Sequence, residues 1–342
     1  MKLLLKSQTD IRNFLKISGL CLVMVSCQKK ETTTTVSVGI ESIRPEFKNV
    51  IDEQISVSVL ATGYSWSEGP LWLEAEKKLI FSDVPANTVY QWTEEQGASV
   101  YLSPSGYTGE PSAKREGSNG LALDDEGNLL LCQHGDRRVA MMNSSTTEPA
   151  PNFSTIVDNF EGKRFNSPND LAFCNTEIFF TDPAYGLPKQ MDDPAKELPF
   201  QGVFRVTANG EVKLVIDSLT RPNGIGFSPD HRKMYGANSD PDKARWYEYT
   251  VNDSLQIVSV KVLYDATAVA KTEKGLPDGL KVDGEGNIFA TGPGGIWIFD
   301  GGGNLLGKIK LQEASSNCAL TSDGKTLFVT NDMNILRIQL RK

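Results

Sequence analysis

The stretch RPNGIGFSPDHRKMYGAN, residues 221–238, decides the fold because its plan recurs along the chain. Asn223 is followed by a short apolar run, a polar turn and a second apolar run. Taken alone, the pair Asn223-Gly224 is typical of a hairpin turn. Six segments share this plan at spacings of 51, 50, 54, 55 and 39 residues, which indicates an internal repeat. They begin at Glu68, Asn119, Asn169, Asn223, Asp278 and Asn317.

The repeat predicts an all-β fold. A period of about 50 residues has room for four short strands with their turns, and one such sheet cannot cover both of its own faces. Packing the sheets as blades around an axis removes that problem. Six units therefore predict a six-bladed β-propeller of four-stranded blades, with short apolar runs separated by Gly, Pro, Asn and Asp throughout.

Closure of the ring needs a strand from elsewhere in the chain. Only 25 residues follow Asn317, which is too few for a whole blade. The strand-like run QISVSVLATGY, residues 54–64, precedes the first repeat. We expect this N-terminal strand to pair with the last blade and to leave no open edge at the seam, so that the propeller spans residues 51–342.

Residues 1–26 differ from the rest of the chain and are predicted to be a signal peptide of the lipoprotein type. Basic residues precede the apolar stretch ISGLCLVMVS, residues 17–26, which is too short to span a bilayer. Its end, VMVSC, resembles the lipobox of bacterial lipoproteins, whose cysteine, here Cys27, becomes acylated. An ordinary signal peptide with a cysteine near the cleavage site is the alternative.

Residues 27–50 are polar and rich in threonine, and they show no apolar periodicity. We expect them to form a tether between the membrane and the propeller. The chain is then predicted to be an exported lipoprotein, anchored to a membrane facing the periplasm or the cell surface. Contact with that membrane is expected only through the lipid on Cys27.

Net charge argues against a nucleic-acid partner, and the spacing of the cysteines argues against a cysteine zinc site. The net charge is −8, and loss of residues 1–26 makes it three units more negative, which excludes a nucleic-acid partner. Cys132, Cys174 and Cys318 lie singly in apolar runs, without the paired spacing of a zinc site, and are predicted to be buried thiols. The sequence does not indicate an oligomeric state.

The leading residues of the six repeats are predicted to form a cation site. If each first run is the innermost strand of its blade, its leading side chain stands at one mouth of the central channel. Two carboxylates and four amides suit a hard cation, and calcium accepts such oxygens in flexible geometry. The alternative is a set of amides bonded to one another or to water. Repulsion between Glu68 and Asp278 counts against that alternative.

The second apolar run of each repeat ends in a polar residue, about 13 to 16 positions after the leading residue of that repeat. We expect this second tier to line a pocket above the ion. His134 is one of only two histidines in the chain, so its place in the tier gives it a pocket role or, alternatively, a core role. The tier consists of Asp83, His134, Asp182, Asn238, the Gly-Pro-Gly at 292–294, and Asp332.

At these residues the sequence resembles the gluconolactonase, or senescence-marker-protein/regucalcin, family of six-bladed propellers. The motifs are SEGPLW, NGLALD, GKRFNSPNDLAF, FFTDPAYG, RPNGIGFSPD and PDGLKVD with TGPGGIWIF, and the resemblance covers residues 60 to about 335. It implies that Glu68, Asn223 and Asp278 are metal ligands, and that Asn169 is a ligand or a substrate contact. The family's arginine ahead of this asparagine corresponds to Arg164, although the intervening spacing is longer here.

The resemblance also implies hydrolysis of a sugar lactone to the aldonic acid, with a divalent ion at the ring carbonyl. Calcium is the expected ion, with zinc, manganese or magnesium as alternatives. A cation with open sites polarises an ester carbonyl, and a nearby base must accept a proton from water. Asp278 is the leading candidate for that base, with His134 or Asp182 as alternatives. Asn119, Asn169, Arg164 and Tyr185 are the predicted substrate contacts.

Two other functions fit the same sequence. A non-catalytic calcium-binding propeller could bind a sugar or a protein at its mouth, because propellers host many functions. A paraoxonase-like esterase would favour His134 as the base and a more apolar pocket. The chain has no G-x-S-x-G elbow, so a serine nucleophile is not expected.

Overall fold

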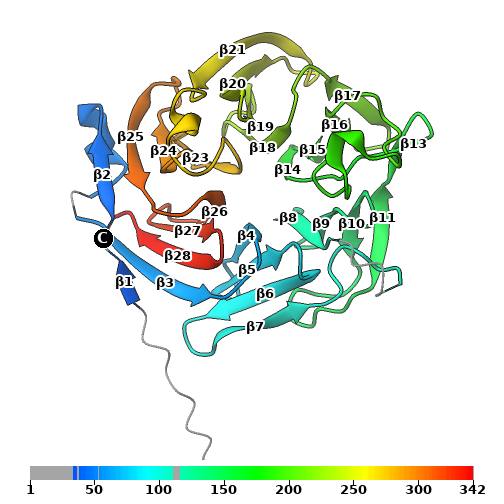
Figure 1. Cartoon of the computed structure of the whole chain (residues 1–342), viewed down its shortest axis with the longest axis horizontal. Coiled ribbons are helices and arrows are strands. Elements are labelled where there is room, and N and C mark those ends of the chain that lie inside the picture. The colour runs from blue at the N-terminus through cyan, green and yellow to red at the C-terminus, as the bar shows by residue number, and fades with distance from the viewer. Residues whose placement is uncertain (1–33, 37, 53, 111–115, 342) are drawn as a thin grey trace, which may run out of the picture. The chain divides into compact units, whose positions relative to one another are not determined.

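Six antiparallel sheets are arranged around a common axis, as predicted (Figure 1). The computed structural model describes residues 34–36, 38–52, 54–110 and 116–341. The expected signal peptide, residues 1–26, and Cys27 lie outside this range. No helix among the described residues is both long and apolar enough to cross a bilayer.

Blades one to four are each built from four consecutive strands, and the first strand of each lies nearest the axis (Figure 1). Blade one contains β4 (Ser67–Leu73), β5 (Lys78–Asp83), β6 (Thr88–Thr93) and β7 (Gly97–Leu102). Blade two contains β8 (Ser118–Leu123), β9 (Leu129–Gln133), β10 (Arg138–Met142) and β11 (Phe153–Val157). Blade three contains β14 (Leu171–Cys174), β15 (Glu177–Asp182), β16 (Gly202–Val206) and β17 (Val212–Ile216). Blade four contains β18 (Pro222–Phe227), β19 (Lys233–Asp240), β20 (Lys243–Val251) and β21 (Ile257–Asp265).

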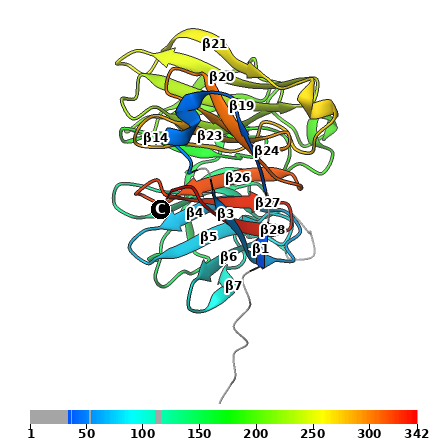
Figure 2. The same cartoon turned by 90° about the vertical axis from the view of Figure 1, so that its left-hand side faces the viewer.

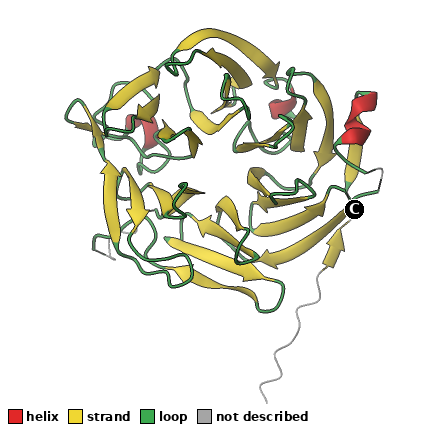
Figure 3. Ribbon diagram, turned by 180° about the vertical axis from the view of Figure 1, so that it is seen from behind, coloured by secondary structure: helices red, strands yellow, loops and turns green. Residues whose placement is uncertain are grey.

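Blades five and six each take strands from the N-terminal part of the chain. Blade five contains β22 (Leu280–Val282), β23 (Ile288–Gly292), β24 (Gly295–Phe299) and β25 (Leu305–Lys310), with β2 (Gly39–Ser42) on its outer edge. Blade six contains β26 (Ser315–Leu320), β27 (Thr326–Asn331), β28 (Asn334–Gln339) and β3 (Ser56–Thr62), with β1 (Thr34–Val36) outermost. Short elements outside the blades are the hairpin β12 (Asn159–Phe160) with β13 (Lys163–Arg164), and the 3-10 turns η1 (Pro45–Asn49), η3 (Gln190–Asp192) and η4 (Val269–Lys271), drawn red in Figure 3.

The predicted closure of the ring is confirmed. β3 pairs antiparallel with β28, so that Ser58 lies opposite Arg337 and Val57 opposite Ile338. Figure 2 shows β1, β3 and β28 side by side at this seam. The last blade is therefore completed by a strand from the other end of the chain.

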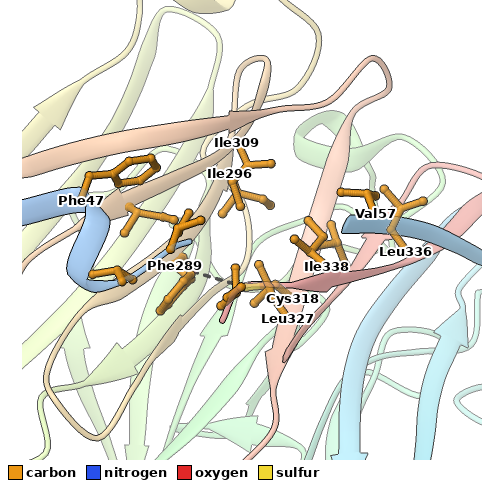
Figure 4. Packing of buried hydrophobic residues seen from close by; sticks show 14 of the residues in the cluster. Phe47, Val57, Phe289, Ile296, Ile309, Cys318, Leu327, Leu336 and Ile338 are labelled. Carbon is orange, nitrogen blue, oxygen red and sulfur yellow. Dashed lines mark hydrogen bonds between the residues drawn. The ribbon is translucent and has the colours of Figure 1, made fainter. Parts of the chain in front are cut away.

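The expected tether over residues 27–50 is wrong for much of its described part. β2 pairs with β25, and Phe47, Val50 and Ile51 are buried in the core of the fifth and sixth blades. Figure 4 shows Phe47 packed in this cluster with Phe289 and other apolar residues of both blades. The prediction failed because these apolar residues lie in and after a 3-10 turn and do not follow the alternation of a strand. The folded unit begins near residue 33.

Truncation of Phe47 tests whether this segment belongs to the propeller. Phe47 is 3% exposed, and Phe47→Ala should cost about 3–5 kcal/mol of unfolding free energy, because it leaves a cavity in the core. Ile43, on the same segment, is 46% exposed, and Ile43→Ala should change stability by about 0.5 kcal/mol or less. Denaturant unfolding of both variants gives the comparison. Equal unfolding midpoints for the two variants would show that this segment is a tether and not part of the folded core.

Candidate functional site

The inner strand pairs change register near the leading residues of the repeats. We call these leading residues the ring residues. An extra residue in a bulge bends a strand and re-aims the side chains beside it. The registers of four inner strand pairs shift at Glu68/Leu71, Ser118/Leu121, Pro222/Ile225 and Ser315/Asn317. The same distortion therefore recurs where a side chain has to turn toward the axis.

Glycine follows several ring residues because neighbouring inner strands approach closely. A Cβ atom added to Gly69 would lie 2.0 Å from the carbonyl oxygen of Asn119 in the next blade. At Gly224 the corresponding distance, to the carbonyl oxygen of Asp278, is 2.2 Å. Both distances are far below the closest approach of real atoms. A Cβ atom on Gly120 would likewise lie 2.7 Å from the carbonyl oxygen of Asn169. Asn223-Gly224 is thus part of β18 rather than a hairpin turn, with glycine required by the neighbouring backbone.

A cavity of about 620 Å³ lies over the ring residues. Its wall has two different halves. Blades two to four contribute mostly polar side chains, which are Glu116, Asn119, His134, Asn169, Tyr185, Gln190, Asn223 and Ser239. The segments leading into blades five and six, together with blade one, contribute the apolar side chains of Ala270, Leu276, Ala314, Trp66, Val84 and Pro85. The same side also carries Glu68, Glu273, Asp278 and Ser315.

Five of the six ring residues meet at this cavity, as the repeat predicted. Four of them are at most 4% exposed, and Asp278 is accessible only in part. The sixth, Asn317, is not among the cavity-lining residues. Its amide contacts the Lys281 ammonium at 3.1 Å and the Asp170 carboxylate at 3.3 Å instead. The five are Glu68, Asn119, Asn169, Asn223 and Asp278.

The two ring carboxylates are held in an environment that opposes their charge. Burial, with a smaller contribution from the nearby Asp170, raises the pKa of Glu68 to about 7. Burial also raises the pKa of Asp278 well above its usual range, with Glu68 and Asp170 adding to the effect. Ionising both groups together is therefore costly unless a positive charge lies between them.

The atoms around these carboxylates fit a hard cation. Asn119 Oδ1 and Asp278 Oδ1 are buried and have no hydrogen-bond partner among the residues that the structure describes. Asn223 donates from Nδ2 to Ser239 Oγ at 2.9 Å, which leaves its amide oxygen as the available acceptor. Within the described ranges, no group of three or more His, Cys, Asp or Glu side chains is arranged to hold a metal, so a cation here needs the amide oxygens as well.

Asp170 is a central residue that the sequence analysis missed. It is 2% exposed, and its carboxylate lies 3.8 Å from Lys281 Nζ. It also accepts a hydrogen bond from the backbone N–H of Leu171 at 2.9 Å. The available signal was its position directly after Asn169, where four other repeats have glycine.

The prediction that the second tier lines the cavity is wrong for every member except His134, because the lining residues do not include Asp83, Asp182, Asn238, residues 292–294 or Asp332. Asp182 is fully buried and accepts hydrogen bonds from the backbone N–H groups of Asn166 and Ser167 at 2.7 and 2.8 Å. It does not line the cavity, and burial raises its pKa to about 7. Asp83 and Asn238 bind the backbone N–H groups of the equivalent loops in blades one and four. These three side chains fix the loops that lead into the inner strands.

Of the predicted substrate contacts, Tyr185 lies at the cavity and Arg164 lies away from it. Tyr185 lines the cavity, and burial raises the pKa of its phenol, with Asp278 contributing. Arg164 lies in β13, is exposed, and donates from Nη2 to the carbonyl oxygen of Asp136 at 2.8 Å. The longer spacing ahead of Asn169 thus moves Arg164 away from the cavity wall.

His134 is the second-tier residue that does line the cavity. Its side chain is 2% exposed, and Nδ1 lies 2.9 Å from Oε2 of Glu116. Its Nε2 is buried without a hydrogen-bond partner in the described part of the chain. Glu116 also lines the cavity and was missed by the sequence analysis, because it lies in a loop without strand periodicity.

Fold and site together define a six-bladed propeller with an oxygen-rich centre on its axis. The chain belongs to the SMP-30/gluconolactonase/LRE-like family, whose profile matches residues 66–332. A gluconolactonase of Zymomonas mobilis is 36% identical over 311 residues, which cover 88% of this chain and 86% of that protein. Pentonolactonase XacC of Haloferax volcanii is 26% identical over 80% of this chain and 83% of its own length. A solved gluconolactonase structure from Xanthomonas campestris has a TM-score of 0.77 at 26% identity, covering 92% of this chain and 99% of the other.

Substitution of Gly224 tests the close approach of the inner strands. Gly224→Ala should destabilise the protein by several kcal/mol, about the size of other overpacking or backbone-shift effects, because the new Cβ collides with the backbone at Asp278. Gly284→Ala is the matched control, because its added Cβ meets no atom within 4 Å. Thermal unfolding measures both. A Gly224→Ala variant as stable as the control would show that the strands can separate freely.

Proposed function

We propose that this protein hydrolyses sugar lactones to the corresponding aldonic acids. The observation that carries the proposal is the convergence of ring-residue oxygens at one cavity, in a chain 36% identical to a gluconolactonase. A lactone presents a ring carbonyl with several hydroxyl groups, and the polar half of the cavity offers complementary groups. Asn119, Asn169 and Tyr185 are the proposed substrate contacts on that side.

We infer that the reaction depends on a divalent cation. Glu68, Asn223 and Asp278, with Asn169 as a further ligand, would hold it, and their oxygens suit calcium best, with zinc, manganese or magnesium as alternatives. A bound cation would polarise the ring carbonyl and stabilise the negative charge that develops on its oxygen. The buried acceptors on Asn119 and Asp278 support this assignment.

The chain itself must orient water and accept its proton. Asp278 and His134 both face the cavity, whereas Asp182 is committed to the loop at Asn166. The buried amides around the cavity orient the hydroxyl groups of the substrate. Binding of the lactone over the ring residues excludes bulk water, which strengthens each of these polar contacts.

The apolar side chains in the cavity wall favour a second candidate substrate. Trp66, Val84 and Leu276 present no hydrogen-bonding groups except the indole N–H, so they suit an alkyl or aryl substituent. A lactone or ester with such a substituent would be hydrolysed by the same groups. This is the paraoxonase-like alternative, on the same scaffold.

A panel of lactones tests the function and the metal together. We expect acid release from aldonolactones, measured with a pH indicator on protein lacking residues 1–26. EDTA should abolish it, and calcium, zinc or manganese should restore it. Asp278→Asn should lower kcat/KM by about 100-fold or more, because it removes a charged ligand. Asp125→Asn, an exposed turn residue, is the control and should keep full activity.

The outcomes of this panel separate the alternatives. Activity that survives chelation contradicts metal dependence. Turnover confined to alkyl- or aryl-substituted lactones and esters favours the second candidate. Absence of turnover across all lactones and esters contradicts the enzyme and favours a propeller that only binds its ligand.

We also infer that the protein is exported and anchored through a lipid on Cys27, from the basic and apolar pattern of residues 1–27. Expression of the full chain in a bacterial host should give a membrane-bound product labelled by radioactive palmitate. Cys27→Ser should lose the label, while Cys132→Ser should keep it because Cys132 is buried in blade two. A wild-type product without the label would contradict the anchor.

A further inference from the structure

We propose that His134 takes the proton from the attacking water and that Glu116 is the residue that positions His134. This inference rests on the proposed lactone hydrolysis. His134 follows β9 and Glu116 precedes β8, so both come from blade two, and both line the cavity. The Nδ1–Oε2 distance of 2.9 Å joins them on one side of the imidazole. The other ring nitrogen is buried, and no described residue forms a hydrogen bond with it.

The carboxylate of Glu116 fixes the tautomer of the imidazole. An ionised carboxylate only accepts hydrogen bonds, so the Nδ1 atom beside it carries the hydrogen. In the neutral ring, Nε2 then keeps its lone pair. A histidine paired with an acid in this way is the arrangement expected of an oriented general base. Nε2 is the atom that the pairing leaves for the substrate side.

The ring is held by packing as well as by the hydrogen bond. The backbone N–H of His134 donates to the carbonyl oxygen of Gly117 at 3.1 Å. A Cβ atom on Gly186 would lie 2.7 Å from His134 Cβ and 2.8 Å from Ser167 Cβ. Blade three therefore packs directly against the imidazole, and this leaves little room for a different rotamer.

Comparison with the other blades shows that this contact departs from a structural pattern. In blades one and three the second-tier residue is an aspartate, and it accepts backbone N–H bonds from positions three and two residues before the ring residue. Glu116 occupies the position three residues before Asn119. In blade two the acid thus lies on the loop and the second-tier residue is the base. Fixing this loop does not require a histidine, because an aspartate does so in blades one and three.

The proposed proton transfer balances without another reactant. The water oxygen bonds to the carbonyl carbon while Nε2 of His134 accepts a proton from that water. When the ring C–O bond breaks, its electron pair stays on the ring oxygen, which receives the proton back from Nε2. The products are the hydroxy acid and a neutral His134.

Kinetics of matched variants test the roles of the two residues. Once wild-type turnover is established, His134→Gln should lower kcat by about 100-fold or more, and Glu116→Gln by about 10-fold, with KM within about twofold in both. Glu313→Gln is the control, because its side chain is 39% exposed, like the 38% of Glu116, but pairs with Lys274. It should keep wild-type kcat. Circular dichroism confirms that each variant is folded.

Nitrogen NMR tests the positioning role without turnover. The chain has only His134 and His231, so spectra of ¹⁵N-histidine-labelled protein are assigned with His231→Gln. In spectra recorded at alkaline pH, where imidazoles are neutral, wild-type His134 should show a protonated Nδ1 and a bare Nε2. Glu116→Gln should populate both tautomers, because a glutamine amide offers Nδ1 an acceptor and a donor.

The two measurements have distinguishable failures. A wild-type protein that turns over no lactone overturns the proposed function, and the base assignment falls with it. Wild-type turnover with kcat unchanged in His134→Gln overturns the base assignment alone. A His134 spectrum that Glu116→Gln does not alter overturns the positioning role of Glu116.

Discussion

The close approach of the six inner strands to the axis is the constraint on which the site depends. Where Gly69 and Gly224 meet the backbone of the next blade, no space remains for a side chain. Ring residues come from segments dozens of positions apart, yet closure of the ring through β3 and β28 keeps them in one place. The oxygen cluster is therefore a property of the closed ring and not of any one blade.

Gathering these residues has an electrostatic cost. The carboxylates of Glu68, Asp170 and Asp278 influence one another's pKa. Of these three, only Asp170 forms an ion pair within the described part of the chain, with Lys281. Burial of like charges is unfavourable and adds nothing to packing. Natural sequences accept such costs at functional sites. Lys281 also lowers the pKa of Glu68, but by less than burial and Asp170 raise it.

The sequence predicted the parts of the molecule that repetition controls. Because every blade uses the same hairpin plan, aligning the repeats was enough to bring Glu68, Asn223 and Asp278 together. Counting the residues after Asn317 was enough to predict the closure. Phe47 escaped this reasoning because it packs from a 3-10 turn that occurs once in the chain. Non-repeating contacts leave no periodic signal from which they could be inferred.

Residues at equivalent positions of the second tier also differ in what they bind. Asp182 and His134 occupy the same tier, and their spacing from Asn169 and Asn119 is similar. Asp182 bonds to backbone N–H groups, which every loop offers, so its direction is set by the backbone alone. His134 bonds to the side chain of Glu116, and no other blade has an acid there. The direction of each second-tier side chain thus follows from its partner on the loop, and the repeat that reveals the tier does not contain that information.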